Sequence, residues 1–196
     1  MNVNVEITKH MAASTHKPAY REVDDFYSTP RSAVEQLLQV EPFDGPVWEP
    51  ACGDGAISRV LQEAGHEVIS TDLVHRGYGQ AGVDFLMERK PLARNVLTNP
   101  PFKLGTEFAV HALGLVPGKV AMLLKIGFLE GPTREALHQS LARVWVIRRR
   151  VTFLKGGKEF SRSNGKGGIH TYAWFVWDRE HRGPVTLGWL PGEACK

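Results

Sequence analysis

Cysteines are few in this chain of 196 residues, and long apolar runs and a strong excess of one charge are absent. No apolar run approaches the roughly 20 residues that a membrane-spanning helix needs, and residues 1–17 lack the apolar core of a signal peptide. Cys52 and Cys195 cannot form a disulfide framework, which favours a reducing cytoplasm. The net charge of +3 permits a nucleic-acid partner without requiring one. We therefore expect a cytoplasmic protein with no membrane partner.

Metal and phosphate sites of the common kinds are also missing. No metal is predicted, because metal-ligand spacing is absent around His66, His75, His111, His138 and His181. The segment Gly53-Asp54-Gly55 lacks the third glycine of a dinucleotide-binding loop, and no Gly-Lys-Ser/Thr follows it. The carboxylates of Glu49 and Asp54 would repel phosphate and suit a cationic ligand.

Predicted strands and helices alternate through the first half of the chain. A short apolar run, residues 47–48, ends in the glycine-containing loop 49–55, and apolar residues at helical spacing follow it. A second apolar run, residues 68–72, ends on Asp72. Strand, glycine loop, helix, strand and acid in this order predict half of a doubly wound α/β fold.

One domain accounts for most of the chain, since its length and its 42% of hydrophobic residues suffice for a full core. We expect residues 1–22 to be a flexible N-terminal arm and residues 23–196 to be the domain. Within it, the basic and glycine-rich residues 148–170 are a candidate loop for nucleic-acid contact; the alternative is a solvated hairpin loop. The candidate contacts are Lys155, Lys158, Arg162, Asn164, Lys166 and His170.

The tetrapeptide Asn99-Pro100-Pro101-Phe102 follows another predicted buried strand, residues 95–98. The prolines end that strand because they lack amide protons and hold φ near −65°. The Asn99 side-chain oxygen and the Pro100 carbonyl are left as acceptors at the strand's C-terminal end, beside the Phe102 ring. Two acceptors next to a ring face suit a planar base that carries an amino group. The alternative is a strand stopped by prolines next to a packed phenylalanine.

Together these motifs resemble the S-adenosylmethionine-dependent amino-methyltransferases, most closely the DNA adenine-N6 branch. The resemblance is carried by residues 49–55, Asp72, Asp84-Phe85 and residues 99–102. Tyr27-Ser28-Thr29-Pro30 is similar to the additional cofactor motif of that family. Its place ahead of the glycine loop is similar to the gamma ordering and to small phage or prophage enzymes, which implies a bacterial or phage-infected host cell.

The resemblance implies an α/β, Rossmann-like class I methyltransferase fold, with a mostly parallel seven-stranded sheet and an antiparallel late strand. It implies S-adenosylmethionine as cofactor, held by Tyr27, Thr29, Pro30, Glu49, Ala51, Gly53, Gly55, Asp72, Asp84 and Phe85. In this arrangement Asp72 would bind the ribose hydroxyls and Asp84 would accept a hydrogen bond from the cofactor's adenine amino group. Phe85 would lie against the adenine ring, although a core position is as common for such a residue.

The activity implied is methyl transfer to the N6 amino group of adenine in DNA, with Asn99, Pro100, Pro101 and Phe102 as the catalytic set. An exocyclic amino nitrogen is a poor nucleophile because its lone pair is delocalised into the ring. Acceptors on Asn99 and Pro100 can bond its two hydrogens and free the lone pair for in-line attack on the methyl sulfonium. Phe102 would stack on a base flipped out of the double helix.

Three alternatives stay open: cytosine-N4 transfer, an RNA- or glutamine-directed methyltransferase, and an inactive fold that binds nucleic acid. Asparagine at position 99 favours adenine over cytosine, and Phe102 with the basic residues 148–170 favours DNA. Larger enzymes of the resembled family carry a target-recognition region that this sequence lacks. We then expect the DNA target to be recognised by residues 148–170 or by a second subunit, or the target to be short. The protein is expected to be a monomer or a homodimer.

Overall fold

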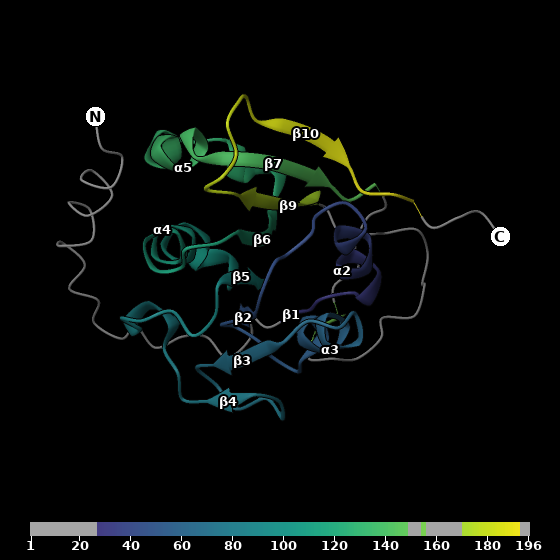
Figure 1. Cartoon of the computed structure of the whole chain (residues 1–196), viewed down its shortest axis with the longest axis vertical. Helices are drawn as coiled ribbons and strands as arrows, with labels where there is room; N and C mark the ends of the chain where they lie inside the picture. The colour runs from purple at the N-terminus through teal and green to yellow at the C-terminus, as the bar shows by residue number, and fades with distance from the viewer. Residues whose placement is uncertain (1–26, 149–153, 156–169, 193–196) are drawn as a thin grey trace.

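The structure is a computed structural model in which residues 27–148, 154–155 and 170–192 are described. Within these residues, eight strands form one sheet in the order β10-β7-β9-β6-β5-β2-β3-β4 (Figure 1). A separate two-stranded sheet pairs β1 (Tyr27–Ser28) with β8 (Leu154–Lys155) in antiparallel fashion.

The parallel half of the sheet reverses its direction of growth at β2 (Val47–Glu49). The chain first adds β3 (Val68–Asp72) and β4 (Gln80–Ala81) on one side of β2. It then crosses back to place β5 (Asn95–Thr98) on the other side, followed by β6 (Val120–Lys125). Such a reversal creates a crevice beyond the carboxyl ends of the strands, where open α/β sheets bind their ligands.

The late strands include the one antiparallel member among the described strands of the large sheet. β9 (Tyr172–Trp177) runs antiparallel to both β6 and β7 (Leu141–Val146). β10 (Thr186–Trp189) pairs parallel with β7 at the sheet edge. The predicted α/β fold, with a mostly parallel sheet and an antiparallel late strand, is therefore confirmed. The number of strands differs from the prediction. The sheet has eight strands where seven were expected, because β10 pairs with β7 and adds one strand at the edge.

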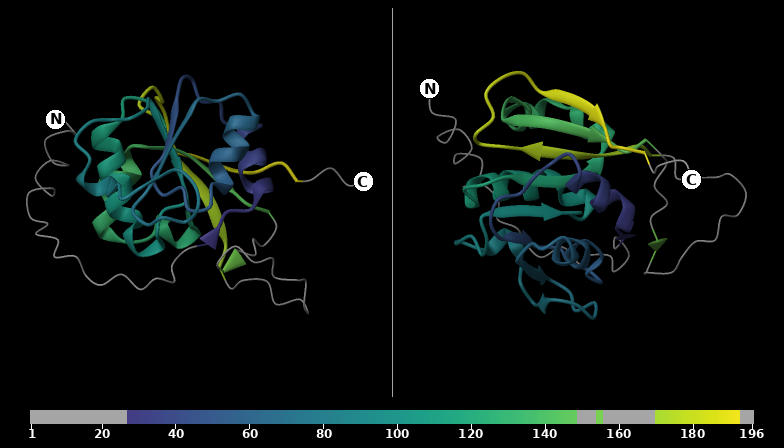
Figure 2. Two further views of the ribbon diagram at one scale, coloured as in Figure 1. Left: turned by 90° about the horizontal axis from the view of Figure 1, so that it is seen from below. Right: turned by 45° about the vertical axis from the view of Figure 1, so that its right-hand side comes forward.

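Helices cover both faces of the sheet and make three layers (Figure 2). α2 (Arg31–Leu38) and α3 (Ala56–Glu63) lie on one face, and α4 (Gly105–Leu115) and α5 (Glu135–Gln139) lie on the other. Short 3-10 helices are η1 (Phe85–Met87), η2 (Phe102–Leu104), η3 (Ile126–Leu129) and η4 (Pro132–Arg134). None of the helices in the described ranges is long and apolar enough to cross a bilayer.

Strand β6 shows why the sheet has a hydrophobic core on each face. Its side chains alternate, as they do along any strand. Val120, Met122 and Leu124 belong to the core cluster that contains the buried residues of α4. Ala121 and Leu123 belong to the cluster that contains those of α2 and α3. All five are at most 2% exposed, which explains the continuous apolar run of a strand that is covered on both sides.

The amino-terminal edge of the parallel strands is held by a charged network around Glu41. This carboxylate is 1% exposed and accepts hydrogen bonds from Lys119, Arg143 and Trp145. Burial opposes its ionisation, but the bonds from Arg143 and Lys119 outweigh burial and lower the pKa of Glu41. Arg143 also pairs with Asp178 at 2.7 Å.

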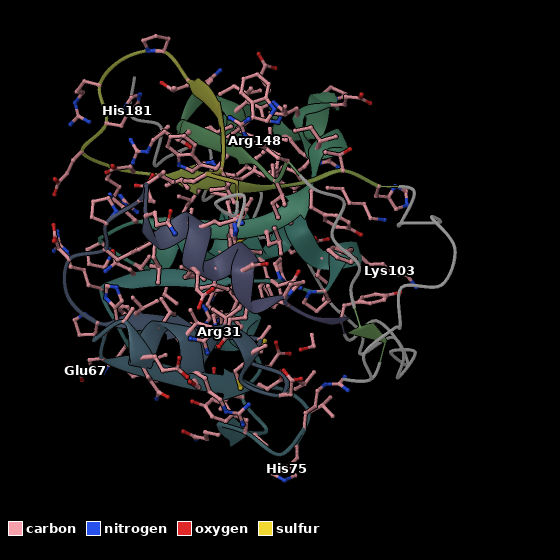
Figure 3. All side chains as sticks on the ribbon, turned by 90° about the vertical axis from the view of Figure 1, so that its right-hand side faces the viewer. Arg31, Glu67, His75, Lys103, Arg148 and His181 are labelled. Carbon is pink, nitrogen blue, oxygen red and sulfur yellow. The ribbon has the colours of Figure 1, made fainter. Side chains whose placement is uncertain are left out.

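The two edges of the sheet are easily told apart from the side. In Figure 3, Glu67 and His181 lie toward the amino-terminal edge, and Lys103 lies on the opposite side, beyond the end of β5. The charge network around Glu41 and the predicted site residues therefore lie at opposite ends of the parallel strands.

Candidate active site

Three neighbouring parallel strands end together at the switch point. Val47 of β2 pairs with Val68 of β3 on one side and with Asn95 of β5 on the other. With these registers, the carboxyl ends of the three strands carry Glu49, Asp72 and the residues that precede Asn99 to one edge. The structure thus brings the predicted cofactor loop and the predicted catalytic tetrapeptide to the same crevice.

The glycine loop bends tightly and is tied to the end of β3. Gly53 and Gly55 have φ of 55° and 81°, a left-handed conformation that glycine adopts without steric cost. The amide of Gly53 donates to Oδ2 of Asp72 at 2.8 Å. The amide of Cys52 donates to the carbonyl of Thr71 at 3.0 Å. These bonds hold the loop backbone close to Asp72, so that one ligand can contact both.

Glu49 is a fully enclosed acid at the start of this loop. Its side chain is 1% exposed and accepts from the Ser58 hydroxyl, which also lies 2.6 Å from the hydroxyl of Ser70. Burial raises the pKa of Glu49 well above its ordinary value despite the bond from Ser58, and the carboxylates of Asp54 and Asp72 raise it further. A cation that binds here would lower that pKa and relieve the crowding of negative charge.

The ring of Tyr78 covers the outside of the glycine loop. A Cβ added to Gly55 would lie 2.5 Å from this ring. The Tyr78 hydroxyl donates to Gln62 at 3.0 Å, its carbonyl accepts from the Cys52 thiol at 3.6 Å, and Arg59 lies over the ring. Burial raises the pKa of the Cys52 thiol to about 12, so Cys52 packs as a neutral group and is not an activated nucleophile.

The Asn99 amide is anchored on its nitrogen side. Nδ2 donates to the carbonyl of Tyr27 at 3.3 Å and to the Thr29 hydroxyl at 3.0 Å. Oδ1 is buried and has no hydrogen-bond partner among the described residues. Threonine followed by proline is typical of a capping hydroxyl before the first helical position. Here Pro30 is the N-cap instead, the helix begins at Arg31, and the Thr29 hydroxyl bonds Asn99.

Phe102, three residues after Asn99, belongs to an aromatic cluster. Its ring centroid lies 5.8 Å from that of Tyr27 and 5.5 Å from that of Tyr172. The ammonium of Lys125 lies 5.2 Å from the Phe102 centroid. A base that stacks on Phe102 would therefore join an existing group of rings with a cation beside it.

Asp84 and Phe85 lie at the start of η1, with different surroundings. Oδ1 of Asp84 accepts from the amide of Leu86 at 3.1 Å and caps the short helix. Phe85 is 2% exposed and packs against the rings of Trp48 and Phe108. The core alternative for Phe85 agrees with this burial, and contacts of either residue with an adenine stay predictions.

The remaining predicted residues fall into two groups. Pro30, Ala51 and Pro101 are half-buried in the loops of the site, and Pro100 is buried. Of the predicted nucleic-acid contacts, the exposed His170 precedes β9, and the backbone of Lys155 pairs with that of Tyr27. The others lie outside the described residues: Lys158, Arg162, Asn164 and Lys166.

Sequence reasoning missed several residues that the fold brings to the site. Ser58 donates to Glu49 and is hydrogen-bonded to Ser70, Tyr78 covers the glycine loop, and Lys125 approaches Phe102. In the sequence, Ser58 only marks a departure from a glycine pattern. Leu73 and Val74 directly follow Asp72 and are exposed, 38% and 45%.

Comparisons with known proteins identify the fold. No protein-family model matches the sequence, and no curated protein matches it. Among solved structures, a dimethyladenosine transferase from Plasmodium falciparum aligns with a TM-score of 0.50 and 12% identity, over 78% of this chain and 63% of that one. Protein 1320 from Thermoplasma acidophilum aligns with a TM-score of 0.51 and 12% identity, over 92% and 100%. This is the class I S-adenosylmethionine-dependent methyltransferase fold.

Proposed function

We propose that this protein transfers a methyl group from S-adenosylmethionine to the N6 amino group of adenine in DNA. The observation that carries the proposal is the Asn99 amide, whose nitrogen is fully engaged and whose buried oxygen is an acceptor without a donor among the described residues. A buried acceptor that is left unsatisfied costs free energy. A ligand that brings a hydrogen-bond donor to Asn99 is therefore favoured at this position.

The residues at the glycine loop fit a cofactor that is cationic at one end and carries a ribose. Glu49, with its raised pKa, provides a carboxylate that gains from a nearby positive charge. The positive φ at Gly53 and Gly55 lets a ligand approach the backbone closely. Each Asp72 oxygen accepts one backbone amide and keeps a second lone pair for a ribose hydroxyl.

The chemistry that the bound cofactor supplies is an electrophilic methyl group on a sulfonium. On the protein side, the Asn99 oxygen and the Pro100 carbonyl accept the two hydrogens of the substrate amino group. This weakens conjugation of the nitrogen lone pair with the ring and directs the lone pair toward the methyl group. Catalysis would then consist of positioning and electrostatics. Formation of the new N–C bond would be matched by cleavage of the C–S bond, with a neutral thioether as leaving group. The cationic methylated nitrogen would then be acidic and would lose its proton to water, so no separate general base is required.

A nucleic acid is the favoured substrate because of what surrounds Asn99. The aromatic cluster of Tyr27, Phe102 and Tyr172 offers stacking surface for one base. The antiparallel pairing of Tyr27 with Lys155 brings this residue of the basic segment next to the motif that holds Asn99. A flipped base and its flanking phosphates could then be bound by neighbouring parts of the chain.

The test is transfer of a labelled methyl group to unmethylated plasmid DNA, RNA and a protein mixture, followed by nucleoside analysis. N6-methyladenine in DNA supports the proposal. N4-methylcytosine, labelled RNA or labelled protein would replace it with one of the other methyltransferases, and no product together with retained nucleic-acid binding would indicate an inactive fold. The Asn99→Ala variant should lose at least about a hundredfold in rate while it still binds the cofactor. Gln139→Ala, an exposed amide in α5, is the matched control.

A further inference from the structure

The two hydrogen bonds on Asn99 Nδ2 settle which way the amide faces. An asparagine amide has two N–H donors, and both find acceptors here: the Tyr27 carbonyl and the Thr29 hydroxyl. A flipped amide would turn Oδ1 toward the Tyr27 carbonyl, and two acceptors repel each other. The segment ahead of α2 therefore leaves the Asn99 side chain with a buried acceptor and no spare donor.

Thr29 is well placed to hold this orientation. It is 6% exposed, and the proline that follows restricts its backbone to extended conformations. Its hydroxyl makes the shorter of the two bonds to Asn99, 3.0 Å against 3.3 Å. The N-cap position belongs to Pro30, so the Thr29 hydroxyl is engaged by the side chain at the reaction centre and not by the helix.

We infer that Thr29 is a positioning residue for Asn99 and thereby a determinant of which base edges the site accepts. With its nitrogen engaged, Asn99 can pair only with a donor. An amino group satisfies the buried Oδ1, whereas a carbonyl oxygen, as on thymine or at O6 of guanine, meets a second acceptor. This inference rests on the proposed function for its substrate, but the orientation of the amide is a property of the protein alone.

The kinetic test compares Thr29→Val, which keeps the shape without the hydroxyl, with Thr29→Ser, which keeps the hydroxyl. In methyl transfer at saturating cofactor, Thr29→Val should lower kcat about tenfold, the equivalent of one hydrogen bond, and this factor should exceed any change in the cofactor Kd. Thr29→Ser should recover most of the rate. Thr186→Val, an exposed position in β10, is the control for a generic loss of a threonine hydroxyl.

Two kinetic outcomes would overturn the inference. If Thr29→Val weakens cofactor binding and leaves kcat unchanged, Thr29 serves the cofactor and not Asn99. If Thr29→Val keeps the parent kcat and Thr29→Ser is the impaired variant, the methyl group and not the hydroxyl matters, and the role is packing.

A second measurement does not depend on any substrate. The side-chain amide protons of Asn99 can be assigned by NMR from the pair of signals that Asn99→Asp removes. In the unaltered protein they should exchange slowly with solvent, and in Thr29→Val one of them should shift and exchange at least about tenfold faster. Unchanged signals would refute the positioning role even if methyl transfer to DNA is found. A clear change would support it even if the DNA substrate is wrong.

Discussion

The amide of Gly53 donates to Oδ2 of Asp72 at 2.8 Å, which joins the loop after β2 to the end of β3. The other oxygen of the same carboxylate accepts from the amide of Val74, also at 2.8 Å. Asp72 thus organises two backbone segments before any ligand binds. Its carboxylate is pointed by these bonds, so a ribose would meet a group that is already oriented.

Replacing Asp72 should therefore affect both the loop and the cofactor. Asp72→Ala removes two charge-assisted bonds to backbone amides and is expected to weaken S-adenosylmethionine binding by roughly tenfold to a hundredfold, and to destabilise the fold by about 1–3 kcal/mol. Asp72→Asn keeps one acceptor oxygen, so it should weaken cofactor binding and fold stability less than Asp72→Ala does. Titration calorimetry and urea unfolding measure the two effects. Unchanged cofactor affinity in Asp72→Ala would remove the ribose contact.

Gly55 is expected to tolerate no side chain. Its φ is 81°, and an added Cβ would lie 2.5 Å from the Tyr78 ring. Gly55→Ala therefore combines backbone strain with a clash, and should cost about 1–3 kcal/mol for the strain and more for the clash. Adding Tyr78→Ala to Gly55→Ala should recover only the part of the lost stability that the clash causes. Urea unfolding of the two single variants and the double variant separates the contributions, and purely additive losses would show that the ring does not press on the loop.

The pH dependence of stability should carry the signature of Glu49. Its pKa in the fold is raised above 4.5 by burial and by neighbouring acids, so its contribution is full below the unfolded-state value and is lost as pH rises through the folded-state value. In the absence of cofactor, Glu49→Gln should flatten the fall in Tm between about pH 5 and pH 8. It should also weaken cofactor binding. Thermal scans compare it with Glu67→Gln, an exposed acid; parallel Tm curves would exclude a buried, titrating Glu49.

The contribution of Glu41 to stability should depend on pH in the opposite sense to that of Glu49. Its pKa is lowered below 4.5 by the bonds that outweigh burial, so its stabilisation is present above that value and lost as pH falls through the folded-state pKa. Glu41→Gln leaves Arg143 and Lys119 without their buried partner and should cost roughly 3–5 kcal/mol at neutral pH. The difference from the parent protein should shrink near pH 3, as measured by urea unfolding; a constant difference would contradict the charge network.

The basic segment can be tested by charge alone. Glutamine at Lys155, Lys158, Arg162 and Lys166 should weaken DNA binding. It should also lower the slope of log affinity against log salt, by up to about 0.9 for each phosphate that the protein no longer neutralises. Arg89→Gln with Lys90→Gln, two exposed cations after η1, is the control for loss of positive charge elsewhere, and its change in slope is compared per charge removed. Equal changes in slope per charge removed in the two sets of variants would reduce the segment to solvated surface.

The fold class and the place of the site were readable from sequence because both depend on local patterns. Apolar runs that end in Glu49, Asp72 and Asn99 predict parallel strands, and the carboxyl ends of parallel strands meet at one edge. Edge elements were harder. β4 pairs through two residues and β10 through four, both largely exposed, so neither shows the apolar pattern of a buried strand.

Contacts between distant residues could not be read in the same way. Capping a helix is the local preference of threonine before such a segment, but an amide 70 positions later takes the Thr29 hydroxyl instead. Ser58 carries no signal that it will bond Glu49. The acids and bases of the Glu41 network are likewise spread from position 41 to position 178.

The inventory and order of chemical groups follow from the sequence alone: the glycine loop, the acid after the second strand and the asparagine before two prolines. The protonation of Glu49 in the glycine loop and the orientation of the Asn99 amide depend on the folded chain. Burial and neighbouring carboxylates raise the pKa of Glu49, and the Tyr27 carbonyl with the Thr29 hydroxyl engages the Asn99 nitrogen and leaves the buried oxygen as an acceptor. Protonation and orientation depend on the atoms within a few ångströms, and folding brings those atoms from distant parts of the chain.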